Sequence, residues 1–185
     1  MGYYTSFEGT IAFDRPLDEN LARFIKAFTK TRHVKRNVNT LNNTLNNIGI
    51  DPQIMLPPVP SIKDFGPDGM LFVPQYRPTN TTYTEDLFEK IPNVYNDVSV
   101  EDANTPPGTC PNLWADIELS ETNDSLTLLD GKNYDYQEWL RWLIRHIFEP
   151  AGYTLNGNIT WQGEDQGDYG TISVKNNDVD ISFRP

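Results

Sequence analysis

Three carboxylates cluster in the segment GEDQGDYG, where Glu164, Asp165 and Asp168 lie between two stretches of alternating apolar and polar residues. Oxygen-rich turns can hold Ca2+ or Mg2+, and neighbouring carboxylates can share acid and base roles when their surroundings separate their pKa values. The twelve-residue calcium loop with its central Gly and final Glu is absent, however, and an exposed turn gives little desolvation. We interpret the segment as a hairpin turn, with recognition of a partner by its acidic edge as the functional alternative.

A basic patch, TKTRHVKR, contains Arg32, His33, Lys35 and Arg36 in an otherwise acidic chain. Cations just past the end of a helix are favoured by the helix dipole, which is the structural interpretation of this patch. The functional alternative is a pocket for an anionic ligand such as a nucleotide phosphate. These four residues are therefore the candidate anion-binding set.

The remaining reactive side chains form no recognisable catalytic motif. A nucleophile pair made from Cys110 and either His33 or His146 requires proximity that spacing alone does not supply, and a single spaced His is not a metal signature. The sequence has no glycine-rich phosphate loop, GxSxG or HExxH. We therefore expect no catalytic residue, no metal and no cofactor. Trp142, which lies off the apolar stripe of its helix, is interpreted as covering the insertion or facing a partner.

Charge and cysteine content limit the classes of partner. Fifteen Lys and Arg against 26 Asp and Glu give a formal net charge of −11. A surface of that sign repels nucleic acid, so we expect no direct nucleic-acid binding and a partner with a basic surface instead. The single cysteine fits a reducing cytoplasm. The start MGYYTSFEGTIAF has no basic region followed by an apolar run, and no apolar window is long enough to span a membrane, so we expect neither a signal peptide nor membrane insertion.

The N-terminal half predicts one strand and one helix before a long irregular region. YYTSFEGTIAF alternates like a strand, with Gly9 as a bulge or a point of close approach, and Leu17 to Phe28 carry a helical apolar stripe. RNVNTLNNTLNNIGIDP is either a short amphipathic helix or a polar loop. Residues 51–111 hold most of the prolines and predict an irregular insertion, with a short strand at MLFVP.

The C-terminal part is more regular. NLWADIEL and SLTLLDG predict a hairpin, NYDYQEWLRWLIRHIFEPAG predicts an amphipathic helix, and the remainder predicts a three-stranded meander. Asn176 and Asn177 occupy the position of a tight turn, where both tolerate a positive φ.

Together these elements predict an α+β fold in which two amphipathic helices cover one face of a mainly antiparallel sheet. We expect a single domain of residues 1–185, divided into a strand and helix (1–31), an Asn- and Pro-rich insertion (32–111), and a hairpin, helix and meander (112–185). A ferredoxin-like arrangement with extra strands is one candidate topology.

The block YDYQEWLRWLIRHIFEPAGYTLNGNITWQGEDQGDYGTISV resembles a family of small uncharacterised proteins of bacteriophages, mobile elements and bacteria, and the MGYYT start is similar to the start of some of them. The resemblance carries over no catalytic residue and implies a phage or mobile-element setting. On that basis we expect a non-enzymatic acidic binding protein, a phage-encoded inhibitor of a host defence protein. The partner-binding candidates are Glu164, Asp165, Asp168 and Trp142. The alternatives are a binder that sequesters an anionic nucleotide and, last, an enzyme of unrecognised type.

Overall fold

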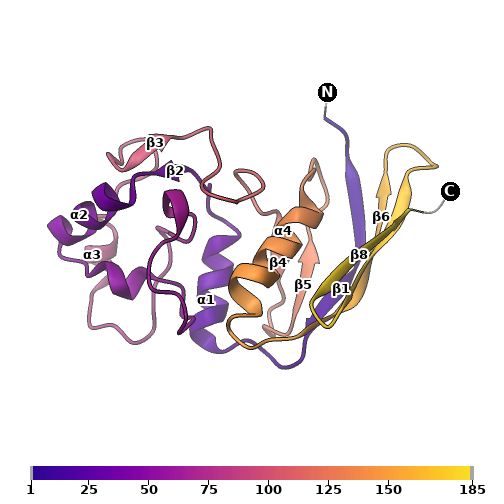
Figure 1. Cartoon of the computed structure of the whole chain (residues 1–185), viewed down its shortest axis with the longest axis horizontal. Helices are drawn as coiled ribbons and strands as arrows, with labels where there is room; N and C mark the ends of the chain where they lie inside the picture. The colour runs from indigo at the N-terminus through magenta and orange to yellow at the C-terminus, as the bar shows by residue number, and fades with distance from the viewer. Residues whose placement is uncertain (1, 184–185) are drawn as a thin grey trace. The chain divides into compact units, whose positions relative to one another are not determined.

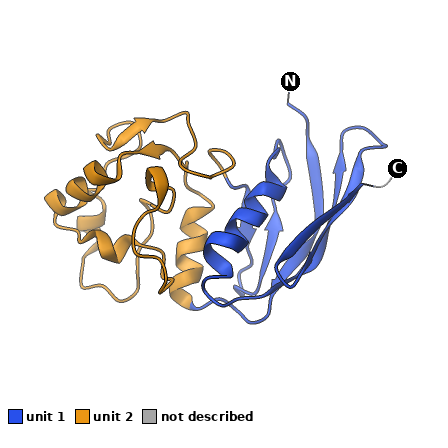
Figure 2. Ribbon diagram, viewed as in Figure 1, with its two compact units in different colours: residues 1–18, 115–185 blue, residues 19–114 orange. Residues whose placement is uncertain are grey.

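The structure is a computed structural model that describes residues 2–183, and the chain folds into two compact units. Unit 1 consists of residues 1–18 and 115–185, and unit 2 consists of residues 19–114 (Figure 2). The sequence predicts an insertion over residues 32–111, whereas unit 2 spans Glu19–Trp114 and so includes the first helix. That the chain forms a single domain stays a prediction.

Unit 1 is built on a six-stranded antiparallel sheet (Figure 1). The strands run in the order β4-β5-β1-β6-β7-β8. Their bounds are β1 Thr5–Phe13, β4 Ile117–Leu119, β5 Ser125–Leu128, β6 Leu155–Gly163, β7 Tyr169–Lys175 and β8 Asp178–Phe183. The part β4-β5-β1-β6 has the strand order of a ferredoxin-like β-α-β-β-α-β arrangement, and β7 and β8 extend it. The first strand, the hairpin and the meander are confirmed.

Two glycines allow β1 and β6 to approach closely. Gly9 has φ 115° and Gly157 has φ 153°. A Cβ on Gly9 would collide with the backbone carbonyl oxygen of Asn158, and a Cβ on Gly157 would collide with that of Thr10. Because β1 and β6 pair residue by residue without a shift, Gly9 is a point of close approach and not a bulge.

One helix covers one face of this sheet within unit 1. Helix α4, Tyr136–Leu143, continues directly into a π-helical turn, Ile144–Phe148. Its ends contact β1 through edge-to-face ring pairs, Phe7 with Tyr136 at 4.9 Å and Phe13 with Phe148 at 4.8 Å between centroids. Since side chains alternate along a strand, Glu8, Thr10 and Ala12 of β1 point to the opposite face, whereas the buried Ile11 shares the face of the two phenylalanines.

Unit 2 contains the first helix and the insertion, and it has a core of its own. Its elements are α1 Glu19–Phe28, β2 Lys35–Arg36, α2 Val38–Ile48, α3 Glu85–Phe88, β3 Val100–Asp102 and two 3-10 turns, Pro52–Met55 and Pro67–Gly69. Strands β2 and β3 pair antiparallel. One buried cluster joins the segments, and it consists of Leu41, Leu45, Ile50, Met55, Leu56, Phe65, Phe72 and Phe88. The insertion is therefore packed, although it has little regular structure.

The α+β class with a mainly antiparallel sheet is confirmed. Two helices of unit 2 can be compared with the elements that the sequence predicts. Helix α1, expected beside α4 on the sheet, packs Phe24 edge-to-face on Tyr76 of its own unit, with 5.2 Å between centroids. For RNVNTLNNTLNNIGIDP the helix is correct: Asn37 caps α2 by accepting from Thr40 N, and Gly49 ends it in the left-handed conformation.

The strand predicted at MLFVP is wrong. Residues 70–71 and 74–75 form turns with irregular backbone between them, and the consecutive residues Met70, Leu71, Phe72 and Val73 are all buried. A run that is buried on every side has no exposed face, and apolar runs of this length do not distinguish a strand from a packed turn.

No helix in the described part of the chain is both long and apolar enough to cross a membrane.

Candidate functional site

The negative charge of the protein is concentrated in unit 1. Residues 1–18 and 115–185 contain sixteen Asp and Glu against six Lys and Arg, a net charge of −10. Residues 19–114 contain ten against nine, a net charge of −1, so the two values account for the total of −11. The negative potential around the protein therefore arises mainly from unit 1.

The sheet face opposite α4 is polar from β1 to β8, as the strand register shows. One cross-strand row joins Glu8, Thr160, Thr171 and Ser182, and the next joins Thr10, Asn158, Ser173 and Asp180. Glu8 and Asp180 are exposed, and they place carboxylates on two separate strands of this face. We call this surface the polar sheet face.

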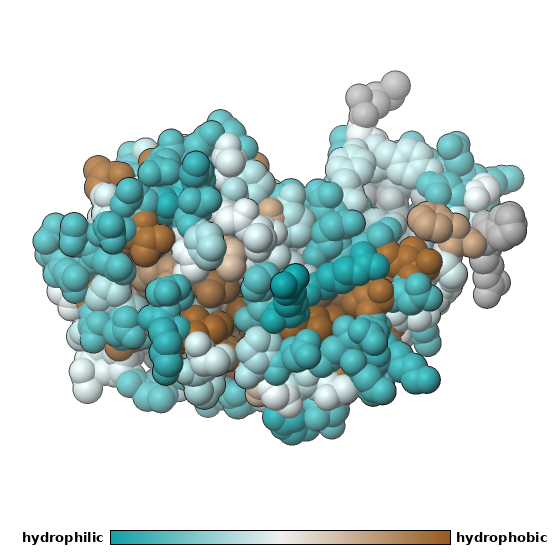
Figure 3. Space-filling view, viewed as in Figure 1, coloured by the Kyte–Doolittle hydropathy of each residue, from teal (hydrophilic) through white to brown (hydrophobic). Residues whose placement is uncertain are grey.

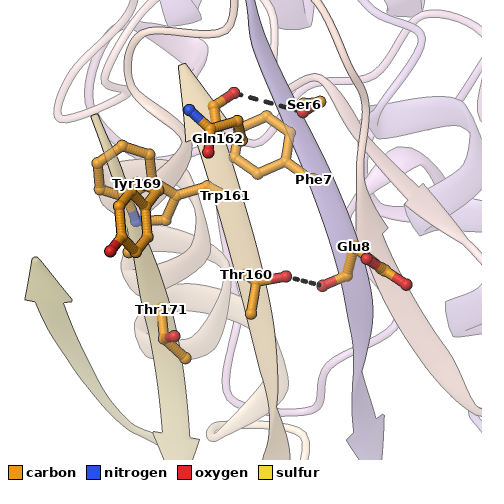
Figure 4. Close-up of a pocket in the computed structure, with 9 residues that line it drawn as sticks. Ser6, Phe7, Glu8, Thr160, Trp161, Gln162, Tyr169 and Thr171 are labelled. Carbon is orange, nitrogen blue, oxygen red and sulfur yellow. Dashed lines mark hydrogen bonds between the residues drawn. The ribbon is translucent and has the colours of Figure 1, made fainter. Parts of the chain in front are cut away.

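A pocket of about 520 Å³ lies on unit 1, where β6 and β7 approach the acidic turn that connects them (Figure 4). Its polar lining residues come from three adjacent strands and are Ser6, Glu8, Thr160, Gln162, Tyr169 and Thr171. Two side chains bond back to the neighbouring strand: Ser6 Oγ donates to Gln162 O at 3.3 Å and Thr160 Oγ1 donates to Glu8 O at 3.3 Å. Phe7, Trp161 and Gly170 also line the pocket, so its lining combines hydroxyl, amide and carboxylate groups with apolar ones.

The acidic segment is a hairpin turn between β6 and β7, as expected, and the N-terminal tyrosines brace it. Tyr3 Oη donates to Asp168 Oδ2 at 2.5 Å and accepts from Asp165 N at 3.3 Å. Glu164 Oε1 accepts from Tyr4 N at 2.8 Å. The hydrogen bond to Asp168 raises the pKa of Tyr3. Glu164 and Asp168 therefore hold the turn in place, and Asp165 keeps an exposed carboxylate beside the pocket.

Gln162 links this turn to the pocket. Its Nε2 donates to the carbonyl oxygens of Gly163, Asp165 and Asp168 at 3.0, 2.9 and 3.2 Å. The turn and the pocket wall are therefore one hydrogen-bonded unit. Within the part of the chain that the structure describes, no group of three His, Cys, Asp or Glu is arranged to hold a metal ion.

Trp142, the fourth partner-binding candidate, is buried, with 5% of its surface exposed. Its ring packs against Trp139 at 5.5 Å and against His146 at 4.7 Å between centroids. Its side chain is thus not brought together with Glu164, Asp165 and Asp168 on an exposed surface.

The basic patch of unit 2 does not converge on one pocket. His33 is buried, its Nε2–H donates to Phe28 O at 3.0 Å, and burial lowers its pKa to about 4, so it is neutral near pH 7. Lys35 Nζ lies 3.9 Å from Glu101 Oε2, and both side chains are exposed. The patch therefore loses two of its four candidate residues as ligands for a shared anion.

The other two candidates, Arg32 and Arg36, line a pocket of about 230 Å³ together with Lys30 and Trp114. Arg36 is buried, and its Nη1 donates to Asp97 Oδ2 and to Ser99 Oγ. No pattern in the sequence predicts this pocket. Lys30 and Trp114 are far apart in the chain, and only the fold brings their segments together.

Cys110 is buried, and burial raises its pKa to about 12. A thiol with that pKa forms almost no thiolate near neutral pH, so its surroundings are the reverse of those that activate a nucleophile.

Comparisons of the chain with protein families, with curated proteins and with solved structures found no match.

Proposed function

We propose that the protein is a non-enzymatic binding protein that recognises a basic partner protein through the polar sheet face and the acidic turn of unit 1. The observation that carries the proposal is the concentration of net charge: −10 of the total of −11 belongs to the unit that presents this face. No described helix of unit 1 covers this face, and its carboxylates lie on separate strands, so it can accept Lys and Arg side chains over an extended area.

The hydrogen bonding of the site supports recognition by a preformed surface. The turn is fixed by Tyr3, Tyr4 and Gln162, so Asp165 is presented from a braced backbone and not from a loose loop. A preformed surface loses less conformational entropy on binding than a flexible one. In the view of Figure 3, hydrophilic residues cover much of the visible surface, and apolar residues show between them.

The setting is the part of the proposal that rests on sequence resemblance. A phage or mobile-element protein of this kind would act in the cytoplasm of its host by occupying a basic surface of a defence protein. Charge complementarity would then chiefly accelerate and orient association, and residues at the centre of the interface would supply most of the affinity.

The experiment is affinity capture from a host lysate with the tagged full chain and two variants. Glu8→Gln with Asp180→Asn removes two carboxylates from the polar sheet face, and Asp86→Asn with Glu89→Gln removes two exposed carboxylates from unit 2. The proposal expects one basic protein to be retained by the native chain and by the unit 2 control. It expects loss of that protein with the face variant and on raising the salt concentration. Equal retention by both variants would reject it.

A further inference from the structure

We propose that unit 2 contains a second site, independent of the acidic face of unit 1, that binds a small anion carrying a planar ring. The site is the pocket of about 230 Å³ lined by Lys30, Arg32, Arg36 and Trp114, with residues 74–75 and 92–94 completing its wall. All of these residues belong to unit 2.

The two arginines are held in fixed positions and keep unused donors. Arg32 Nε donates to Ala103 O at 3.1 Å and its Nη2 donates to Asn104 Oδ1 at 3.0 Å. Arg36 uses only Nη1, towards Asp97 and Ser99. Among the described residues, neither Arg32 Nη1 nor the Nε and Nη2 groups of Arg36 have a hydrogen-bond partner.

An anion is the ligand that such a pocket favours. The side chain of Arg36 is 3% exposed, and a charged donor buried to that extent favours an acceptor. Asp97 balances one of the three cations, so Lys30 and Arg32 leave an excess of positive charge at the pocket. Guanidinium donors match carboxylate and phosphate oxygens in geometry as well as in charge.

Trp114 supplies the reason for a ring. Its side chain lines the pocket and 42% of its surface is exposed, whereas Trp139, Trp142 and Trp161 are all buried. An exposed indole beside cations offers a stacking surface for an aromatic or heterocyclic ring. The volume of about 230 Å³ is below that of a typical drug-sized pocket, so we expect it to hold the anionic group and one ring system, with the rest of a larger ligand outside it.

The experiment is calorimetric titration of the full chain with four probes, accompanied by tryptophan fluorescence. AMP and benzoate each carry a ring and an anion, whereas adenosine lacks the anion and inorganic phosphate lacks the ring. Saturable binding of AMP or benzoate, with at least about tenfold weaker binding of both partial probes, is the expected result. Tighter binding of AMP than of benzoate indicates that the natural ligand carries a phosphate group. Tighter binding of benzoate indicates a carboxylate group.

Two matched substitutions on α1 and the turn after it locate the site. Lys30→Gln is expected to weaken binding of the better probe by about fivefold, and Lys26→Gln, an exposed residue outside the pocket, is expected to leave it unchanged. Trp114→Ala is expected to abolish the preference for the ring-bearing probe over phosphate. Circular dichroism checks that each variant is folded.

The proposal is overturned if neither AMP nor benzoate saturates by about 10 mM, if phosphate binds as tightly as the better of these two probes, or if Lys30→Gln and Lys26→Gln behave alike. Because the site lies in unit 2, these variants should not change capture of a basic partner. A failure here is therefore distinguishable from a failure of the proposed function.

Discussion

The buried ion pair between Arg36 and Asp97 gives a quantitative test of how unit 2 is held together. The two side chains are 3% and 1% exposed, and Asp97 Oδ1 also accepts from Ser99 N at 2.8 Å. The guanidinium carbon of Arg36 lies 4.9 Å from the centre of the Phe72 ring. Asp97→Ala therefore leaves a buried cation without its counter-charge and removes the acceptor for Ser99 N.

The expected loss is large for a domain of this size. Removing one partner of a buried ion pair costs about 3–5 kcal/mol, when whole domains are stable by about 5–15 kcal/mol. Burial lowers the pKa of Arg36, and the Asp97 carboxylate acts in the opposite direction. The desolvation cost of a buried ion pair can exceed the attraction between its two charges. Replacing both residues, as Arg36→Met with Asp97→Ala, should therefore restore most of the lost stability, because the methionine chain can lie against Phe72.

The assay is urea unfolding followed by circular dichroism for the native chain, the single variant, the double variant and a control. Glu101→Ala is the control, since Glu101 lies 3.9 Å from Lys35 in an exposed pair whose loss should cost less than about 1 kcal/mol. A loss below about 1 kcal/mol for Asp97→Ala, or a double variant no more stable than the single one, would refute the reasoning.

Three further changes test other parts of the structure. Burial lowers the pKa of His33 from 6.5 to about 4, so its contribution to stability is fully present above pH 6.5 and is lost as the pH falls towards 4. The shift in pKa corresponds to about 3 kcal/mol of stability. In urea unfolding measured between pH 6.5 and 4, His33→Gln should remove this loss of stability. An unchanged pH dependence would contradict a lowered pKa for His33. Tyr3→Phe removes the hydroxyl that Asp165 N contacts, so amide exchange at Asp165 should accelerate several-fold by NMR; an unchanged rate would show that Tyr3 does not brace the turn. Gly157→Ala should cost about 2–3 kcal/mol because its Cβ meets the backbone of β1, while Gly167→Ala, with nothing within 4 Å, should cost less than about 0.5 kcal/mol; equal thermal shifts would contradict this.

Much of unit 1 could be predicted from sequence because its elements are local and periodic. Alternation specifies each strand, and Asn176 and Asn177, at φ 49° and 72°, adopt the turn that their side chains tolerate. The acidic turn was also placed correctly. Its bracing by Tyr3 was not predicted, because 165 residues separate Tyr3 from Asp168 and no local pattern records such a contact.

Unit 2 shows where such patterns stop being informative. Its prolines correctly predict irregular backbone, yet the run from Met70 to Val73 is buried by tertiary packing and not by pairing in a sheet. The basic patch was visible as charge, but its division into a neutral His33, a paired Arg36 and a pocket-lining Arg32 depends on burial and on distant partners. Neither is encoded in the spacing of charged residues.

The most direct test of the acidic recognition face is the association rate constant for the captured, purified partner, measured at low and high ionic strength. The variant Glu8→Gln with Asp180→Asn should associate about three- to tenfold more slowly than the native chain at low salt, and at nearly the native rate at high salt. The control variant Asp86→Asn with Glu89→Gln should associate at the native rate at both salt concentrations. Equal rates for the native chain and the face variant at low salt, or equal slowing by both variants, would contradict the account.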